Sequence, residues 1–276
     1  MGESHMTEEV KKEGQVITVC SGKGGVGKTV LAVNLAIALS KKNVDVALID
    51  GEFQFGDVSL AMDLQSTFTM KDVVEEQDRL DEYNITNYLT EHESGVKVLS
   101  APSRPEYAEL VSSEVIKKTV QLLKKNFDYV VVDAGHGMDD STIDFMENAD
   151  KILAVTTLEV ASMKNTKMMV ETIHQLQLEK KLELVLNRYN MDSLIKPEEA
   201  PSMLRAEEVR YIPNNFKLTS QSMNLGVPVV VSHAKSDVAK GIFKLAQAII
   251  DQESGRPNNK KDSLLGKMFS FSLFSK

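Results

Sequence analysis

Short apolar runs alternate along the chain with longer segments in which apolar residues recur at helical spacing. The runs are rich in β-branched residues and apolar on both faces, which is typical of parallel strands covered by helices. Strands are predicted at Val16–Cys20, Asp45–Asp50, Val96–Ser100, Tyr129–Asp133, Ile152–Thr157 and Leu182–Leu186. Helices are predicted at Lys28–Lys41, Pro105–Lys125, Ser141–Asn148 and Ala161–Leu178. This alternation predicts an α/β fold, a doubly wound and mostly parallel sheet with helices on both faces.

The chain after Asn190 is less regular. Residues 191–206 are predicted to form a surface excursion, after which the chain re-enters the fold. The re-entry is expected through Val209–Pro213, a helix near Lys217–Asn224, the apolar Val227–Val231 and a helix at Ser236–Asp251. We therefore expect one domain over residues 15–251, preceded by a disordered N-terminus (1–14) and followed by a polar linker (252–262) and a short tail (263–276).

Composition narrows the classes of protein that fit. The chain has 32 Lys plus Arg against 40 Asp plus Glu, a net charge of −8, which argues against a surface that binds nucleic acid or anionic lipid over its whole area. The single cysteine, Cys20, excludes an intrachain disulfide framework, a four-cysteine zinc site and an iron–sulfur cluster held by one chain. No apolar stretch is long enough to span a bilayer, so a cytoplasmic protein is expected.

A glycine-rich segment between the first strand and the first helix carries the clearest chemistry. Residues 21–29, SGKGGVGKT, satisfy the pattern G-x-x-x-x-G-K-[ST]. Glycines let the backbone wrap around phosphate oxygens, so that N–H groups and the helix N-terminus face the negative charge. Lys28 is expected to reach the β- and γ-phosphates and the Thr29 hydroxyl to ligate Mg²⁺. The predicted nucleotide contacts here are Gly24, Gly25, Val26, Gly27, Lys28, Thr29 and Val30.

A second lysine, Lys23, stands inside this loop and completes the string KGGVGKT, the deviant Walker A sequence. On this string the chain resembles the MinD/ParA superfamily of P-loop ATPases. The resemblance implies an enzyme that binds ATP with Mg²⁺ and hydrolyses it. It also implies a homodimer that closes across the nucleotide, in which Lys23 acts catalytically by touching the partner's phosphates.

Two later strand ends match the same family. Leu48–Glu52 lies where the family has a D-x-D switch I, and Phe127–Asp133 resembles its Walker B strand. The resemblance implies that Asp50 takes part in catalysis and ligates Mg²⁺, and that Asp133 contacts the metal through a water molecule. Glu52 replaces the second, water-positioning aspartate and is one methylene longer. Because a shift of about 1 Å can cost about 100-fold in rate, we expect slow turnover. Singly, either aspartate could instead cap the next helix.

The adenine side of the site has weaker candidates. Asn187-Arg188 resembles the family's N-[KR] segment, where an asparagine amide faces the base, and Pro213 opens a segment similar to its P-x-D loop. Thr157-Leu158-Glu159 resembles a T-P-E segment near the dimer interface. His136 follows the Walker B strand, and a surface switch residue is favoured there over a catalytic one.

The segment Asp50–Val58 looks most like the CpaE/TadZ group, which helps to place the Flp/Tad pilus assembly system. Many members carry an N-terminal receiver-like domain, whereas the P-loop here begins about 20 residues into the chain, which weakens that assignment. MinD-like septum-site or flagellar placement and a poorly hydrolysing ATP-dependent scaffold stay open. DNA partitioning is disfavoured because residues 1–255 have 27 Lys plus Arg against 39 acidic residues. An iron–sulfur carrier would need two cysteines.

The last residues differ in charge from the rest. Residues 256–276 have five Lys or Arg and one acidic residue, a net +4. In a helix, the apolar residues of 264–271 would share one face. The family ends in an amphipathic helix that binds membrane, so the resemblance implies an anionic membrane as a partner of residues 263–276, at the inner face of the cell membrane, and an unknown activating protein. A disordered terminus, or a helix docked on its own domain, is an equal alternative.

Overall fold

The computed structural model describes residues 13–206 and 208–253. Within them, eight strands form one sheet in the order β3-β4-β2-β5-β1-β6-β7-β8, and every neighbouring pair is parallel except β3 with β4. The sheet confirms the predicted fold class. The strands are β1 (Gln15–Ser21), β2 (Val46–Gly51), β3 (Thr90–Glu91), β4 (Lys97–Leu99), β5 (Tyr129–His136), β6 (Lys151–Thr156), β7 (Leu182–Asn187) and β8 (Val209–Ile212).

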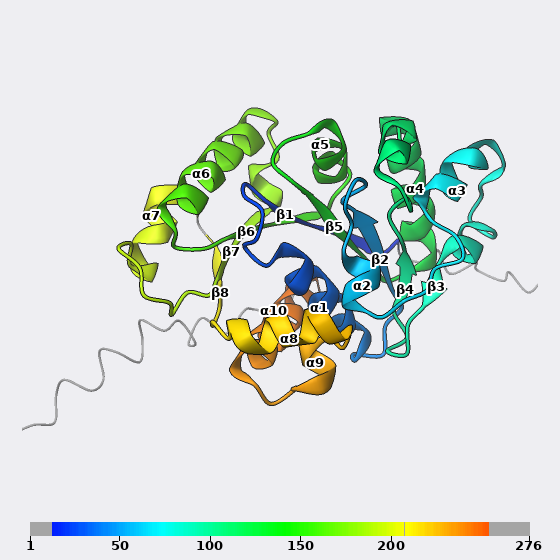
Figure 1. Ribbon diagram of the computed structural model, residues 1–276. Coiled ribbons are helices and arrows are strands. Elements are labelled where there is room, and N and C mark those ends of the chain that lie inside the picture. Colours follow the sequence, from blue (N-terminus) through cyan, green and yellow to red (C-terminus); the bar gives the residue numbers. More distant parts are fainter. Residues whose placement is uncertain (1–12, 207, 254–276) are drawn as a thin grey trace, which may run out of the picture.

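Helices cover both faces of this sheet (Figure 1). Helices α4, α5 and α6 lie on one face, and α1, α8, α9 and α10 on the other. The helices are α1 (Lys28–Ser40), α2 (Val58–Ala61), α3 (Met70–Glu75), α4 (Ser113–Asn126), α5 (Asp140–Glu147), α6 (Val160–Gln175), α7 (Ala200–Leu204), α8 (Phe216–Leu225), α9 (Val229–Ser232) and α10 (Asp237–Glu253). Alternate residues of β1 belong to the two separate cores, Val16 and Cys20 to one, Ile17 and Val19 to the other.

Helix α1 is buried along almost its whole length. Its residues Leu31–Leu39 are all buried, since the helix lies between the sheet and α10. A helix that is apolar all round is stable only when other elements enclose it. Because the P-loop leads directly into α1, this packing fixes the loop against the centre of the sheet.

Several predicted boundaries were wrong. The predicted helix Pro105–Lys125 is two elements, a 3₁₀ helix at Pro105–Leu110 and then α4, because Val111 is extended and the Ser112 side chain accepts a hydrogen bond from the Val115 amide at 3.4 Å. The short elements between residues 52 and 95 were not predicted, since four to six residues are too few to show a period.

The chain ends bear on the predicted domain boundaries. Helix α10 continues to Glu253, two residues into the predicted linker 252–262. The Tyr129 hydroxyl donates a hydrogen bond to Oε2 of Glu253 at 2.5 Å, so this end of α10 is tied to the start of β5. The rest of the predicted linker, the tail 263–276 and residues 1–12 of the N-terminus lie outside the described residues. Among the residues that are described, no helix combines the length and apolar character needed to cross a membrane.

Candidate functional site

The carboxyl ends of the central strands gather the predicted site residues at one edge of the sheet. The P-loop follows β1, Asp50 lies in β2, and Asp133 lies in β5 between these two strands. The register places Asp50 directly beside Asp133. Ligands of open α/β sheets bind beyond this edge, where the crossover connections diverge.

The P-loop backbone is held in a shape that requires glycine. Gly25 and Gly27 have φ angles of 79° and 94°, in the left-handed region that other residues avoid. A Cβ on Gly27 would lie 2.5 Å from Nδ2 of Asn187. That same Nδ2 donates a hydrogen bond to the Val26 carbonyl at 2.8 Å, and Nδ2 of Asn165 donates to the Gly22 carbonyl at 3.0 Å. Neighbouring elements therefore hold the loop at two points.

Lys28 and Asp133 form a buried ion pair beneath the loop. Nζ of Lys28 lies 2.7 Å from Oδ1 of Asp133, and the two residues are 9% and 0% exposed. Burial raises the pKa of Asp133, and the Lys28 ammonium opposes that rise. Oδ2 of Asp133 has no hydrogen-bond partner within the described part of the chain. A buried carboxylate oxygen of this kind is an acceptor for a donor that enters the site, such as a water molecule bound to a metal ion.

Asp50 is the second buried carboxylate. It is 1% exposed and accepts hydrogen bonds from the backbone amides of Val58 at 3.1 Å and Glu52 at 3.3 Å. Burial, and then the charge of Asp133, raise its pKa to about 8. A Cβ on Gly56 would lie 2.3 Å from Oδ2 of Asp50, so only glycine lets the chain pass over the carboxylate. Bringing a cation between Asp50 and Asp133 would remove their repulsion.

Thr29, Asp50 and Asp133 fit a Mg²⁺ ion that shares its ligands with a substrate better than they fit a metal ion bound by protein side chains alone. No group of three or more His, Cys, Asp or Glu with metal-binding geometry occurs in residues 13–206 and 208–253. Mg²⁺ usually keeps several waters and takes only one or two carboxylates, with substrate phosphates completing its shell. Burial raises the pKa of Asp133, and the Thr29 hydroxyl is close enough to offset part of that rise. Thr29, Asp50 and Asp133 are therefore a suitable donor set for a nucleotide-bound magnesium ion.

Two further pairs lie at the rim of the site. Nζ of Lys23 lies 2.7 Å from Oε2 of Glu159, the residue before α6, and both side chains are partly exposed. The Lys23 ammonium lowers the pKa of Glu159. Nδ1 of His136, the last residue of β5, lies 3.2 Å from Oε2 of Glu52, which directly follows β2. Sequence reasoning had not paired these residues, which come from separate elements.

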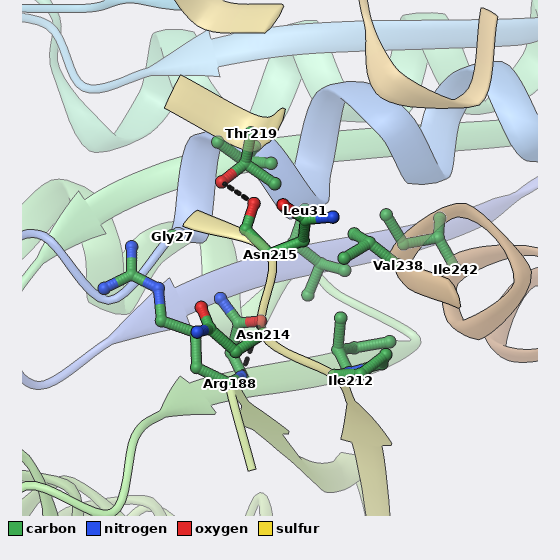
Figure 2. Close-up of a pocket in the computed structure, with 12 residues that line it drawn as sticks. Gly27, Leu31, Arg188, Ile212, Asn214, Asn215, Thr219, Val238 and Ile242 are labelled. Carbon is green, nitrogen blue, oxygen red and sulfur yellow. Dashed lines mark hydrogen bonds between the residues drawn. The ribbon is translucent and has the colours of Figure 1, made fainter. Parts of the chain in front are cut away.

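On the other side of the P-loop, a small hollow opens between β7, β8, α8 and α10 (Figure 2). Gly27 and Arg188 lie at one end, and Val238 and Ile242 at the other. Arg188 has a φ of 52°, and its guanidinium lies 5.2 Å from the centre of the Phe216 ring. The remaining lining residues are Val30, Leu31, Asn187, Ile212, Pro213, Asn214, Asn215 and Thr219.

The hollow joins apolar walls to a few polar groups. Oδ1 of Asn214 is buried and lacks a hydrogen-bond partner among the described residues, while the Asn214 amide donates to Oδ1 of Asn190 at 2.6 Å. Apolar walls with a few placed polar groups are typical of sites that bind small molecules. The predicted Asn187, Arg188 and Pro213 are thus brought together beside Gly27 and Val30. The contribution of α8 and α10 was not predicted, although the amphipathic pattern of α10 indicated a face turned toward the sheet.

Two residues near the site lie apart from this chemistry. Asp57 is exposed just before α2, and it is Gly56 that passes over Asp50. Cys20 is fully buried, and burial raises the pKa of its thiol to about 12, so it belongs to the core.

Comparisons with known proteins identify the family of the chain and agree with its fold. A family model described as an AAA domain, AAA_31, matches residues 14–186. The septum site-determining protein MinD of Thermotoga maritima is 28% identical over 245 residues, which cover 86% of this chain and 88% of that protein. A chain of the MinC:MinD cell division protein complex of Aquifex aeolicus has a TM-score of 0.73 at 26% identity and covers 86% of this chain and 96% of its own.

A third comparison concerns the fold. The MinD of Pyrococcus horikoshii, solved with Mg-ADP, has a TM-score of 0.76 at 22% identity, and the match covers 87% of this chain and 97% of that one. At this identity the likeness shows that the two chains share a fold. The overall arrangement of sheet and helices described above is therefore shared with that chain.

Proposed function

Because the chain belongs to the AAA_31 family of MinD/ParA-type P-loop ATPases, we propose that it is a switch that dimerises on ATP and positions a bacterial envelope machine. The observation that carries this proposal is the buried arrangement of Lys28, Asp133 and Asp50 directly under the P-loop. It supplies a cation for phosphate and carboxylates for a metal ion, which are the parts that phosphoryl transfer requires.

ATP with Mg²⁺ is the proposed substrate. The magnesium ion would be held by Thr29 and Asp50, with Asp133 accepting from a bound water, and it would neutralise charge on the phosphates. Lys28 is the first residue of α1, and its ammonium is held by Asp133. From this position it can pair with the β- and γ-phosphates. That the Pyrococcus relative was solved with Mg-ADP supports this choice of ligand.

The base would occupy the hollow beside Gly27. Asn187 is placed there by its hydrogen bond to the P-loop, and Arg188 and Pro213 line the same hollow. The unpartnered Oδ1 of Asn214 would accept from an exocyclic amino group, which adenine has. This assigns adenine recognition to residues at and just after the ends of β7 and β8.

The deviant Walker A lysine supports a homodimer. Lys23 lies at the rim of the loop with 38% of its side chain exposed, so it can leave Glu159 and reach a second molecule. In the proposed dimer it would contact the partner's nucleotide phosphates. ATP would then control association, because the γ-phosphate is part of the surface that joins the two chains.

The proposal extends to the machine that the switch positions. The segment Asp50–Val58 favours Flp/Tad pilus assembly, as in the CpaE/TadZ group. Septum-site placement is the alternative, and the similarity to MinD proteins supports it. A scaffold that binds ATP and hardly hydrolyses it is favoured by Glu52 alone.

Phosphate release tests the enzymatic part. Wild type is expected to release phosphate from Mg-ATP faster than Lys28→Ala and Thr29→Ala, with Lys240→Ala, a surface lysine paired with Asp237, as the matched control. Thr29→Ala is included because it keeps the buried ion pair. Release by wild type at the rate of both variants, measured with anionic liposomes present, would leave only the scaffold.

The sequence-based proposal for the tail can be tested separately. Residues 263–276 would bind an anionic membrane, and two tails in one dimer would raise the avidity. Sedimentation with anionic liposomes should pellet full-length protein in ATP more than in ADP, and should pellet a version ending at Gly255 in neither. Equal pelleting of both versions would contradict a membrane role of the tail.

A further inference from the structure

The contact between Glu52 and His136 joins the ends of two neighbouring strands beside the P-loop. His136 is the last residue of β5 and Glu52 follows the last residue of β2, and these strands pair in parallel. Oε2 of Glu52 and Nδ1 of His136 are 3.2 Å apart. Burial raises the pKa of Asp133, and Glu52 is near enough for its charge to add to that rise.

The backbone at Glu52 is fixed, whereas its side chain depends on a partner. Gly51 and Phe53 are both buried, and a Cβ on Gly51 would lie 2.7 Å from the ring of Phe145, which also packs against Phe53. The side chain of Glu52 is 22% exposed and has three rotatable bonds. Holding such a side chain in one conformation costs entropy, which a hydrogen bond can offset.

A bulge in β5 places the imidazole. Val19 pairs with Asp133, but Ser21 pairs with His136, so β5 contains one extra residue between these two points. Bulges next to functional sites redirect side chains. The amide of Gly137 donates to the Ser21 carbonyl at 2.8 Å, which closes the bulge, and Cδ2 of His136 lies 3.9 Å from the place of a Cβ on Gly24. The ring therefore lies between the P-loop and Glu52.

We infer that His136 is a positioning residue for ATP hydrolysis: its Nδ1–H donates to Oε2 of Glu52 and so directs Oε1 toward the water that attacks the γ-phosphate. Oε1 has no hydrogen-bond partner within the described residues, which leaves it able to accept from that water. In the reaction the water oxygen bonds to the γ-phosphorus while the bond from that phosphorus to the bridging oxygen breaks. ADP keeps the bridging oxygen and its electron pair, the phosphate keeps one water proton, and the other passes through Glu52 to solvent.

This inference rests on the proposed ATPase function, and the experiment separates the two. Steady-state phosphate release and binding of a fluorescent ATP analogue are measured for wild type, His136→Ala, Glu52→Gln, Glu52→Asp and the combinations of His136→Ala with each Glu52 variant. His174→Ala, an exposed histidine near the far end of α6, is the control. If wild type is no faster than Lys28→Ala and Thr29→Ala, the proposed function fails before His136 is tested.

With an active wild type, His136→Ala is expected to lower kcat about 10- to 100-fold while changing KM and analogue affinity less than about threefold. Glu52→Gln should have a similar effect, and adding His136→Ala to it should change kcat less than twofold, because the two residues act as one unit. In the Glu52→Asp background, His136→Ala should lower kcat by a smaller factor than it does in wild type. The aspartate side chain has one rotatable bond fewer, so it depends less on His136 to hold its conformation.

Two results would overturn the inference. One is a kcat for His136→Ala within twofold of wild type. The other is multiplication of the Glu52→Gln and His136→Ala effects in the double variant, which would mean that they act independently.

Discussion

Nζ of Lys23 lies 2.7 Å from Oε2 of Glu159 in the same chain, so the lysine proposed to reach a second molecule already has an internal partner. Both groups are partly exposed, and ion pairs of this kind are worth about 0.2–1 kcal/mol. Breaking this pair therefore costs little free energy, which the contacts in the dimer must exceed. The pair joins the P-loop to the start of α6, so breaking it would remove a contact between these two segments.

Lys23→Ala is expected to bind nucleotide as a monomer and to lose dimerisation with a non-hydrolysable ATP analogue. Glu159→Gln should tighten the dimer by up to about fivefold, because Lys23 no longer has to leave a charged partner. Sedimentation velocity over a range of protein concentrations measures both, with Glu171→Gln on the exposed side of α6 as the control. A dimer of Lys23→Ala as tight as that of wild type would argue against the proposed role.

Removing the Lys28 ammonium should destabilise the fold as well as the site. In Lys28→Ala the buried Asp133 loses its ion-pair partner, which typically costs about 3–5 kcal/mol. Lys28→Ala/Asp133→Asn should recover much of that loss, because residue 133 then carries no charge that needs a partner. Urea unfolding without nucleotide measures the difference, and equal midpoints for Lys28→Ala and wild type would contradict it.

The raised pKa of Asp50 predicts that the free energy of unfolding depends on pH. Its pKa in the folded protein, about 8, lies above the unfolded value near 3.8, so the folded state holds the proton more tightly. Between these values the unfolded state loses the proton first, and the contribution of Asp50 to stability falls as pH rises. Below about pH 4 both states are protonated and the contribution is constant.

Asp50→Asn should therefore unfold at a higher temperature than wild type at pH 8, with a difference that shrinks toward pH 5. Thermal unfolding in EDTA at several pH values measures this, and the other titrating groups largely cancel between the two proteins. A difference that stays constant with pH would show that Asp50 is ionised in the folded protein.

Cys20 offers a probe of the β1 core. Its thiol is fully buried, with Sγ 4.0 Å from Sδ of Met169, and burial raises its pKa to about 12. A thiol reagent at pH 8 should label the native protein at least about 100-fold more slowly than the urea-unfolded chain, because reaction requires a thiolate and access. Labelling of the native protein at the unfolded rate would mean that β1 opens readily.

The sequence was sufficient for six of the eight strands, the P-loop and the family, because each depends on local patterns. A buried strand followed by SGKGGVGKT and a helix specifies the loop wherever the rest of the chain lies. Apolar runs likewise located most strands within a few residues. The segment between residues 52 and 95 was missed because its elements are too short to be periodic.

Side-chain pairing could not be predicted in the same way. The contact of His136 with Glu52 depends on a one-residue bulge in β5, and that of Lys23 with Glu159 on the packing of α6 beside the loop. Neither has a sequence signal of its own, since the partners are 84 and 136 residues apart. Asn214 shows the same limit, because its unpartnered oxygen is a property of the folded hollow.

Strand β5 pairs with β1 on one side and with β2 on the other, and Asp133 lies between Val19 and Asp50. The loop that would grip phosphate and the carboxylates that would sense it are thus aligned by backbone hydrogen bonds of a single strand. Substitutions on the outer faces of the surrounding helices do not touch these hydrogen bonds, so the outer surface can change while the site residues keep their alignment. Deleting one residue between Tyr129 and Asp133 would instead turn the site residues of β5 to the opposite face of the sheet. We expect such a variant to lose nucleotide binding.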